Sequence, residues 1–285
     1  MTDLEARISR LSCWTAPVTL APLPGGLTNL SFRVEHAGAR YVVRCGDDIP
    51  AHHIFRDRER AASVAAFEAG LSPEVIHAEP GILVLRFVEG RTFAEVDLAA
   101  DVPRLAALLR RVHGEVGRRL RGPANAFWVF QVIRDYLARL AGDGDPAPAA
   151  TYAPTVDRLE ALQVPLPMVF GHNDLLPGNL IDDGTRLWLI DWEYGGFGSP
   201  LFDLANLSAN GAYAPGHDAV LLTRYFGHPP DPALHRAFAA MKAASALREA
   251  LWARVSAVHL QRPGIDYGAH AAEYFGRFGK LVAGI

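Results

Sequence analysis

The hydrophobic pattern of this chain changes from strand-like to helical near Gly90, and that change limits the folds the chain can adopt. Before Gly90, short segments such as LSFRVEH (30–36) alternate apolar and polar residues, as half-buried strands do. After it, segments such as FWVFQVIRDYLARLAG (127–142) carry apolar residues at helical spacing. The sequence therefore predicts an α+β protein whose strands and helices are segregated along the chain.

The N-terminal part contains signals for several strands and one helix. Gly25-Gly26 and Pro80-Gly81 each lie between two strand-like segments, as turn residues do. The segment RDRERAASVAAFEAG (56–70) has a helical pattern and ends at a glycine, which is typical of helix ends. We therefore expect a five-stranded antiparallel sheet accompanied by one helix.

Helical spacing of apolar residues continues towards the C-terminus with a few interruptions. Segments with this spacing are 105–120, 127–142, 153–163 and the region that begins at Asp203. GDGDPAPAATYAP (142–154) is expected to be a connector, because glycine and proline punctuate it. The stretch from Phe170 to Asp191 is expected to be a small strand–loop–strand island within this helical part.

The charge balance argues against a nucleic-acid partner. The net charge is −3, and no basic block is long enough for a nucleic-acid footprint. The densest basic stretch, LRRVHGEVGRRLRG (109–122), places arginines at helical spacing and is expected to be a solvated helix face. The chain also lacks a run of about eighteen apolar residues, so we expect no membrane association.

Cysteine usage and the opening residues favour a cytoplasmic location. Cys13 and Cys45 lie far apart and form no CxxC motif, so they indicate neither a disulfide framework nor a metal site. The opening segment MTDLEARISRL lacks the basic start and the apolar stretch of a secretory signal. We therefore expect a cytoplasmic protein.

Two short motifs place three polar residues beside turns. In FGHNDLLPGNLI, Asp174 is followed five residues later by Asn179, with a Pro-Gly turn between them. In LWLIDWEYGG, an apolar run ends at Asp191. Taken alone, Asn179 suits a left-handed turn and Asp191 could merely end a strand. Their common order, however, matches the chemistry of phosphoryl transfer from a nucleotide.

That chemistry needs a flexible backbone over the phosphates, a cation, oxygen ligands for magnesium and a base near the acceptor hydroxyl. Asn179 and Asp191 supply amide and carboxylate oxygens, which the hard Mg²⁺ ion prefers. Asp174 begins the same loop and is the candidate catalytic base. ATP and Mg²⁺ are therefore the expected cofactors.

The segment GGLTN is the candidate phosphate loop. Gly25 and Gly26 let backbone approach a phosphate closely. The Thr28 hydroxyl and the Asn29 amide can donate hydrogen bonds to it. By itself the Gly-Gly pair is equally compatible with a plain hairpin turn.

The motifs HNDLLPGN, LIDWEYGG and FDLAN, in this order, resemble those of the protein-kinase-like phosphotransferases. The similarity is greatest to the choline/ethanolamine kinase family within the aminoglycoside phosphotransferase superfamily, which GGLTN and YVVR also resemble. It runs from about residue 20 to 210 and more weakly through the helix around Trp252. The resemblance implies a two-lobed kinase-like fold, with a nucleotide-binding lobe at 1–88 and a catalytic and substrate-binding lobe at 89–285.

Lysine usage excludes one class of nucleotide-binding protein and singles out one arginine. The two lysines, Lys242 and Lys280, lie near the C-terminus, so the chain lacks the GxxxxGK motif of P-loop nucleotidases. Most kinase-like folds have a strand lysine where this chain has Arg44, and the resemblance to the choline kinase branch implies an arginine there. Glu59 matches the glutamate that would hold this cation, with a solvated helix glutamate as the alternative.

The resemblance also implies structural and adenine-binding roles. His172 resembles the residue that braces the backbone of the catalytic loop, and Asp203 resembles a buried aspartate that caps a helix and holds this loop. VLRFVEG resembles the hinge between lobes, whose backbone at Arg86, Phe87 and Val88 would meet the adenine edge.

The acceptor is expected to be a small cationic alcohol. Glu193 and Tyr194 lie beside Asp191, and Trp252 lies on the late helix that carries cage aromatics in the family, although a core tryptophan is the alternative. Two departures weaken choline as the acceptor: Asn210 stands where eukaryotic members have a glutamate, and Val255 where they repeat a tryptophan.

The sequence thus predicts an ATP-dependent kinase for a small amino alcohol, similar to choline or ethanolamine kinases. A thiamine kinase and an aminoglycoside phosphotransferase are alternatives within the superfamily. A non-catalytic nucleotide-binding pseudokinase is a further alternative, against which the presence of Asp174, Asn179 and Asp191 argues.

Overall fold

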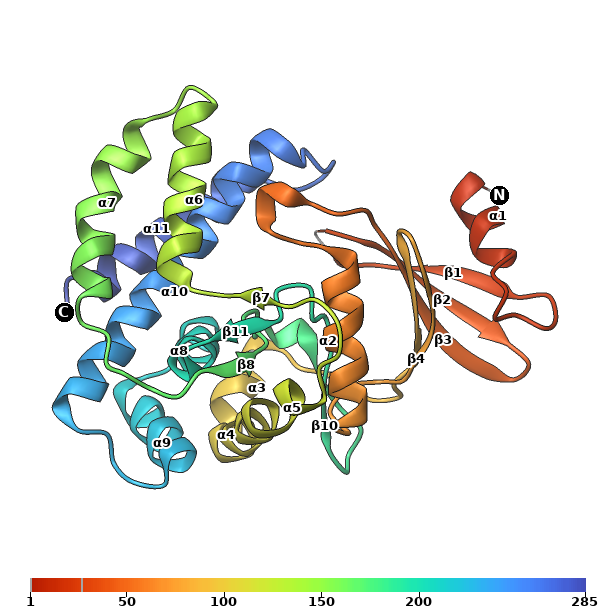
Figure 1. The fold of residues 1–285 in the computed structure, drawn as a ribbon, viewed down its shortest axis with the longest axis horizontal. Helices are drawn as coiled ribbons and strands as arrows, with labels where there is room; N and C mark the ends of the chain where they lie inside the picture. Colours follow the sequence, from red (N-terminus) through yellow and green to blue (C-terminus); the bar gives the residue numbers. More distant parts are fainter. Residues whose placement is uncertain (1, 27) are drawn as a thin grey trace.

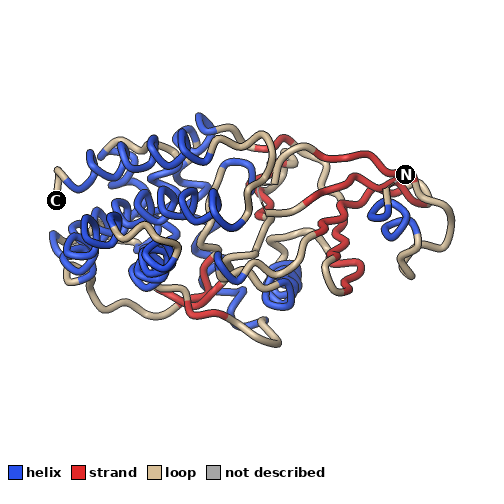
Figure 2. Tube along the Cα trace, turned by 90° about the horizontal axis from the view of Figure 1, so that it is seen from above, coloured by secondary structure: helices blue, strands red, loops and turns tan. Residues whose placement is uncertain are grey.

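The structure is a computed structural model that describes residues 2–26 and 28–285. A sheet-rich N-terminal part and a larger helical part lie side by side, with the N-terminus at the sheet end and the C-terminus at the helical end (Figure 1). The view from above in Figure 2 shows the same separation of strands and helices. The segregated α+β arrangement expected from the sequence is therefore confirmed.

A five-stranded antiparallel sheet forms the N-terminal part, as predicted. Its strands follow the order β1-β2-β3-β5-β4. They are β1 (Thr19–Leu23), β2 (Leu30–His36), β3 (Ala39–Cys45), β4 (Val75–Glu79) and β5 (Ile82–Arg86). Buried Phe32 and Val34 of β2 alternate with the less buried Ser31 and Arg33, so one face of the sheet packs on a core.

A short helix that the sequence analysis did not anticipate packs on this sheet. α1 (Asp3–Ser9) begins at a capping box formed by Thr2 and Glu5. Its Ile8 joins the small core that β2, β3 and β5 also supply. The expectation of a single helix beside the sheet was therefore wrong, because so short a helix carries too little periodic signal to be recognised from sequence.

The helix that was predicted, α2 (Arg56–Glu68), lies between the sheet and the helical part (Figure 1). Its Ala62 and Ala66 are buried in the core of the helical part. Gly70 follows the helix in a left-handed backbone conformation with φ of +67°, which explains why a glycine ends it. The first turn of α2 is thus held beside the sheet, where it carries Glu59.

Helices dominate the rest of the chain. They are α3 (Glu95–Ala100), α4 (Val102–Arg111), α5 (Gly117–Arg119), α6 (Val129–Gly142), α7 (Ala147–Glu160), α8 (Pro200–Asn210), α9 (Pro215–Phe226), α10 (Pro232–His259) and α11 (Tyr267–Val282). Shorter helical turns are η1 (Pro50–His52), η2 (Val112–Val116) and η3 (Pro177–Asn179). In the described part of the chain, none of the helices is long and apolar enough to cross a membrane.

Short strands form two further three-stranded sheets, with the orders β10-β9-β6 and β7-β11-β8. They are β6 (Arg91–Thr92), β7 (Asn125–Ala126), β8 (Val169–Gly171), β9 (Leu180–Asp182), β10 (Leu187–Leu189) and β11 (Gly196–Gly198). The predicted strand–loop–strand island is present, but β8 belongs to one of these sheets and β9 and β10 to the other.

The predicted connector at 142–154 is mostly helical, so that prediction was wrong. α7 begins at Ala147, directly after Pro146. Pro148 occupies its first turn. Backbone N–H groups in the first turn have no partner within a helix, so proline, which lacks this group, is tolerated there. Pro154 lies inside the helix. In this segment the prolines therefore lie at the start of a helix and within it, and they do not indicate a connector.

The helix α10 runs through the middle of the helical part, where it packs against α6, α8 and α11 (Figure 1). Its central turns are buried and include the polar side chains of Lys242, Ser245 and Arg248. Arg248 and Trp252 of this helix reach the wall of the cavity described next.

Candidate active site

A cavity of about 600 Å³ lies between the sheet and the helical part. Most of the residues that the sequence analysis selected contribute to its wall. They are Gly25, Gly26, Thr28, Asn29, Arg44, Arg86, Phe87, Val88, Asp174, Asn179, Asp191, Glu193, Tyr194 and Trp252. Glu59, His172 and Asp203 support the wall from behind, as the following contacts show.

The loop between β8 and β9 positions Asp174 and Asn179. Asn173 at its start has a left-handed backbone conformation with φ of +65°, so the chain turns sharply just before Asp174. The Asn179 side-chain amide donates to the Asp174 carbonyl oxygen at 2.9 Å. This bond uses the amide nitrogen of Asn179 and leaves its side-chain oxygen to act as a ligand.

His172 braces this loop through both ring nitrogens. Its Nε2 donates to the Ile190 carbonyl oxygen at 2.9 Å, and its Nδ1 lies 3.3 Å from the Asp174 backbone nitrogen, from which it accepts. Burial lowers the pKa of His172, so the ring is neutral at physiological pH. These contacts match the bracing role that the resemblance implied and leave no nitrogen for acid–base chemistry.

Asp203 holds the same loop from helix α8. Its carboxylate accepts the backbone N–H groups of His172 at 2.8 Å and Asn173 at 2.7 Å. Burial alone would raise the pKa of Asp203, but a hydrogen bond from His113 at 2.9 Å keeps it below its ordinary value. The implied helix-capping role was wrong: Ser199 is the N-cap of α8, and Asp203 lies one turn further on.

Two asparagines on the same face of α8 extend this support. The Asn206 side chain accepts the Leu175 backbone N–H at 2.6 Å, and the Asn210 amide donates to the Leu175 carbonyl at 3.0 Å. Spacings of three and four residues put them in line with Asp203. The segment that carries Asp174 is therefore fixed by one helix face.

Arg44 joins the sheet to both Glu59 and Asp191. Its Nη1 lies 2.9 Å from Glu59 Oε1, and its Nη2 lies 2.6 Å from Asp191 Oδ1. Burial alone would lower the pKa of Arg44, but these carboxylates hold it above its ordinary range. Glu59 is 2% exposed, so the alternative of a solvated helix glutamate was wrong.

Asp191 has a left-handed backbone conformation with φ of +68°, uncommon for a non-glycine residue. Together, Asn179 and Asp191 offer one amide oxygen and one carboxylate to the cavity, a donor set that fits Mg²⁺ completed by phosphate oxygens and water. In the described residues, no group of three or more His, Cys, Asp or Glu side chains is arranged to bind a metal by itself.

Glu193 ties the candidate phosphate loop to the helical part. Its carboxylate accepts hydrogen bonds from the Thr28 hydroxyl at 2.9 Å and the Asn29 amide at 3.2 Å. Arg56 of α2, which the sequence analysis missed, donates to it at 3.0 Å. Burial and the nearby Asp191 raise the pKa of Glu193 to about 8. The side chain is therefore occupied by the loop and not directed to an acceptor beside Trp252.

The candidate phosphate loop has the backbone that its glycines suggested. Gly25 and Gly26 have φ of +98° and +83°, and a Cβ on Gly26 would lie 3.1 Å from the Asn29 carbonyl oxygen. Leu27 lies outside the described residues. Arg262, from the turn between α10 and α11, donates to the Thr28 carbonyl at 2.9 Å and holds the loop from the other side.

The hinge residues differ in what their backbone offers. The N–H groups of Arg86 and Phe87 donate to the Glu74 and Arg40 carbonyls. Of the N–H groups at these hinge positions, only that of Val88 lacks a partner among the described residues. Of the three predicted adenine contacts, the Val88 N–H is therefore the one that is available as a donor.

Trp252 and Tyr194 form the other end of the cavity. The Trp252 Nε1 donates to the Tyr194 hydroxyl at 3.0 Å, and both rings contribute to the cavity wall although they are largely buried. Trp252 is therefore largely buried, as the core alternative expected, and it is also part of the cavity wall, as a role in substrate binding requires.

Arg248 and Glu249 also line this end of the cavity, and the sequence analysis missed both. The Arg248 Nη1 lies 3.3 Å from Asp174 Oδ1. Burial raises the pKa of Asp174 to about 7, and Arg248 opposes that rise. Glu249 lies one helical turn before Trp252 in REALWARV, which is the signal that could have placed it on the same face.

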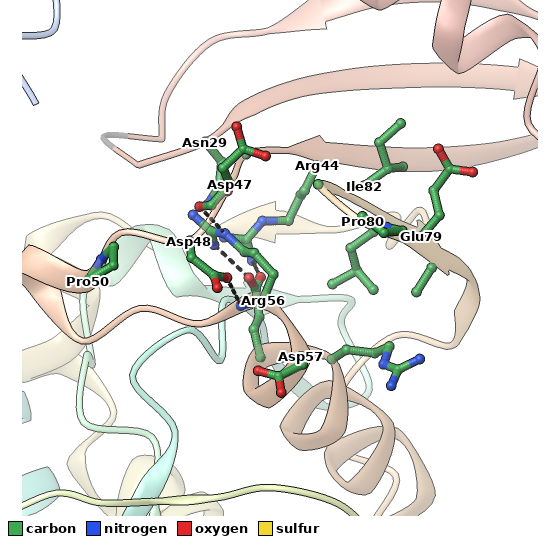
Figure 3. Close-up of a pocket in the computed structure, with 16 residues that line it drawn as sticks. Asn29, Arg44, Asp47, Asp48, Pro50, Arg56, Asp57, Glu79, Pro80 and Ile82 are labelled. Carbon is green, nitrogen blue, oxygen red and sulfur yellow. Dashed lines mark hydrogen bonds and ion pairs between the residues drawn. The ribbon is translucent and has the colours of Figure 1, made fainter.

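A second cavity, of about 660 Å³, shares Asn29 and Arg44 with the first and is shown in Figure 3. Figure 3 shows Arg44 extending from the sheet towards Arg56 in the first turn of α2. None of Asp174, Asn179 and Asp191 contributes to its wall. The smaller cavity is therefore the candidate active site.

Residues 19–258 match the phosphotransferase enzyme family. The chain belongs to this phosphotransferase enzyme family. The matched segment contains all predicted site residues, from Gly25 to Trp252.

Two relatives of this phosphotransferase match part of the chain. The chain is 29% identical to protein LicA of Haemophilus influenzae over 197 residues, which are 64% of this chain and 56% of LicA. It is 29% identical to a thiamine kinase of Shigella boydii over 186 residues, which are 63% of this chain and 62% of that kinase. The chain thus matches less than two thirds of the length of each.

A solved structure covers almost the whole chain. A choline/ethanolamine kinase family protein from Mesorhizobium loti superposes with a TM-score of 0.79 at 31% identity, covering 98% of this chain and 93% of that protein. The predicted kinase-like fold and the resemblance to the choline/ethanolamine kinases are thereby confirmed.

The two departures from eukaryotic choline kinases lie away from the cavity wall. Asn210 bonds to Leu175, and Val255 is buried in the core of the phosphotransferase. Neither contributes to the wall of the candidate active site. Neither side chain is therefore part of the candidate active site.

Proposed function

We propose that this phosphotransferase transfers the γ-phosphoryl group of ATP to the hydroxyl of a small amino alcohol, of the choline or ethanolamine type. The observation that carries the proposal is that one cavity joins Asp174, Asn179 and Asp191 to a glycine turn and to an arginine paired with Glu59. The names of the relatives, which include kinases for choline or ethanolamine and for thiamine, support it.

In this proposal, residues 1–88 bind the nucleotide and residues 89–285 supply the base and the acceptor site. The adenine lies among apolar side chains of the cavity wall, namely Val42, Leu85, Ile181 and Ile190. The Val88 N–H donates to its edge. The backbone at Gly25-Gly26 covers the phosphates, and Glu193 fixes the loop through Thr28.

Arg44 neutralises the phosphates that are not transferred, while Glu59 keeps its guanidinium in place. Because Asp191 holds Arg44 in the structure, nucleotide binding requires Arg44 to exchange this carboxylate for phosphate oxygens. Asn179 and Asp191 would hold magnesium, which supplies charge neutralisation at the phosphates.

Asp174 accepts the proton of the acceptor hydroxyl. The hydroxyl oxygen forms a bond to the γ-phosphorus, and the bond from that phosphorus to the bridging β,γ-oxygen breaks, so that ADP leaves. The pKa of about 7 makes Asp174 able to take up this proton near neutral pH.

The acceptor end suits a compact cation. Trp252 and Tyr194 offer aromatic faces, and Glu249 supplies a carboxylate in place of the predicted Glu193. Glu249 lies 2.9 Å from His270 and 3.6 Å from Arg248, so its charge is partly compensated. This mixture of charges favours a small amino alcohol over a polycationic antibiotic.

A steady-state assay with magnesium and ATP tests the proposal. The acceptors are choline, ethanolamine, thiamine and a neutral sugar alcohol, and ADP release is the measurement. We expect the highest kcat/KM with choline or ethanolamine. Thiamine is the second candidate, because a thiamine kinase is among the relatives. A preference for the neutral alcohol would reject the cation site, and no ADP release with any acceptor would reject this acceptor class.

A further inference from the structure

The side chain of Arg248 is tightly packed at the end of the cavity where the acceptor is proposed to bind. It is 1% exposed, and its guanidinium lies 4.3 Å from the centre of the Tyr194 ring and 5.9 Å from that of Phe127. A planar guanidinium packed near two aromatic rings loses little further freedom when it donates a hydrogen bond. Its direction is therefore set by the packing before any substrate binds.

The guanidinium of Arg248 donates a hydrogen bond to Asp174. In residues 2–26 and 28–285, the Asp174 Oδ1 is the only hydrogen-bond acceptor of Arg248, at 3.3 Å. Oδ2 of Asp174 has no hydrogen-bond partner among the same residues. The contact therefore fixes one oxygen of the carboxylate and leaves the other to meet the acceptor hydroxyl.

A second carboxylate completes the arrangement. Glu249 Oε2 lies 3.6 Å from the Arg248 Nη1, and its Oε1 lies 2.9 Å from His270 on α11. Arg248 thus lies between two carboxylates, both of which line the cavity. A buried cation needs such partners, because an unpaired charge is costly to bury.

We propose that Arg248 is a positioning residue, which orients the Asp174 carboxylate to accept the proton of the acceptor hydroxyl. The inference depends on the proposed function, in which Asp174 is the base. Reacting groups must be held within a narrow range of distance and angle, so that loss of the Arg248 contact lowers the rate of transfer while nucleotide contacts stay intact.

A double-mutant cycle between Arg248→Met and Asp174→Asn tests this proposal. In the wild-type background, we expect R248M to lower kcat by about 10- to 100-fold and to change KM for ATP by less than about 2-fold. In the D174N background, R248M should change kcat by less than about 2-fold, because the group it orients is already lost. Arg248→Lys should recover part of the rate, since it keeps the charge.

A buried ion pair elsewhere on the same helix provides a matched control. Lys242 lies 2.9 Å from Asp218 and does not contribute to the cavity wall. Lys242→Met should lower the thermal midpoint while kcat stays unchanged. If R248M fails to fold, Arg248→Gln enters the same cycle, because it removes the charge with less change in polarity.

The outcomes separate this inference from the proposed function. Equal fold-losses from R248M in both backgrounds, with D174N strongly impaired, would overturn the positioning role alone. A rise in KM for the acceptor with unchanged kcat would also overturn it, since Arg248 would then bind the acceptor itself. If D174N keeps most of the activity, the base assignment falls and the inference falls with it.

Discussion

Arg44 and Asp191 are bonded to each other across the candidate active site, with Nη2 and Oδ1 2.6 Å apart. The cation expected to meet phosphate therefore neutralises the carboxylate expected to meet magnesium. Each would release the other when the nucleotide and its metal arrive together. Glu59 Oε1 forms an ion pair with Arg44 Nη1 at 2.9 Å, and this pair would keep the guanidinium near the phosphates during the exchange.

Asp191→Ala should remove the magnesium dependence of nucleotide binding. The variant loses the only carboxylate of the predicted magnesium ligand pair, while Arg44 keeps its contact with Glu59. Calorimetric titration of ATP with and without magnesium measures the effect. The wild type should bind more tightly with the metal, and D191A should bind equally in both buffers. Equal affinities in the wild type would contradict the metal site.

Arg44→Lys should keep part of the activity, and Arg44→Ala should lose it. Lysine preserves the charge but cannot form the planar fork that reaches two carboxylates at once. The measurement is kcat/KM for ATP, with Arg60→Ala on the exposed side of α2 as the control. Wild-type kinetics for R44A would mean that another cation serves the phosphates.

The rate of transfer should rise with pH around neutrality. Burial raises the pKa of Asp174 to about 7, so the carboxylate form needed for proton uptake increases as pH passes that value. A profile of kcat between pH 5.5 and 8.5, chosen to bracket about one unit or more on each side, measures this limb. Asp174→Asn should lower kcat by about two to four orders of magnitude. A flat profile would argue against Asp174 as the base.

The contribution of His52 to stability should fall as the pH drops below about 6.5. Burial lowers the pKa of His52 to about 3, so the unfolded chain binds a proton at its ordinary pKa while the folded protein does not. At pH 5 this costs about 2 kcal/mol of the free energy of unfolding.

The test compares unfolding by denaturant at pH 7.5 and pH 5, values on either side of an ordinary histidine pKa of about 6.5. On lowering the pH, the free energy of unfolding of the wild type should shift downward by about 2 kcal/mol relative to that of His52→Gln. His228→Gln is the matched control, because His228 is exposed. The same pH dependence of unfolding in the wild type and H52Q would contradict the inference that His52 stays neutral in the folded protein.

Trp252→Ala should raise KM for the amino alcohol and leave KM for ATP unchanged. A cation on an aromatic face gains roughly 0.5–2 kcal/mol, which corresponds to a change of about 2- to 30-fold. Trp252→Phe is the control, since it keeps a ring but loses the hydrogen bond to Tyr194. If KM for ATP rises as much as that for the acceptor, the substitution has disturbed the whole cavity.

Local patterns in the sequence carried much of the fold and the reacting groups. Alternation along LSFRVEH indicated a strand, and the turn between Asp174 and Asn179 indicated a loop that presents both side chains. Such features follow from neighbouring residues, whose backbone preferences act over a few positions. The N-terminal helix was missed for the same reason, because its local signal is short.

The contacts that complete the site were decided by the tertiary structure. Glu193 was predicted to lie at the acceptor but accepts a hydrogen bond from Thr28, which lies 165 residues away in the chain. Arg248 reaches Asp174 across 74 residues, and nothing in the spacing of REALWARV announces that contact. The sequence alone determined which chemical groups are present and which local backbone conformation presents each of them. Only packing decided which charges meet, because burial makes each charged side chain take whatever partner the surrounding elements bring within reach.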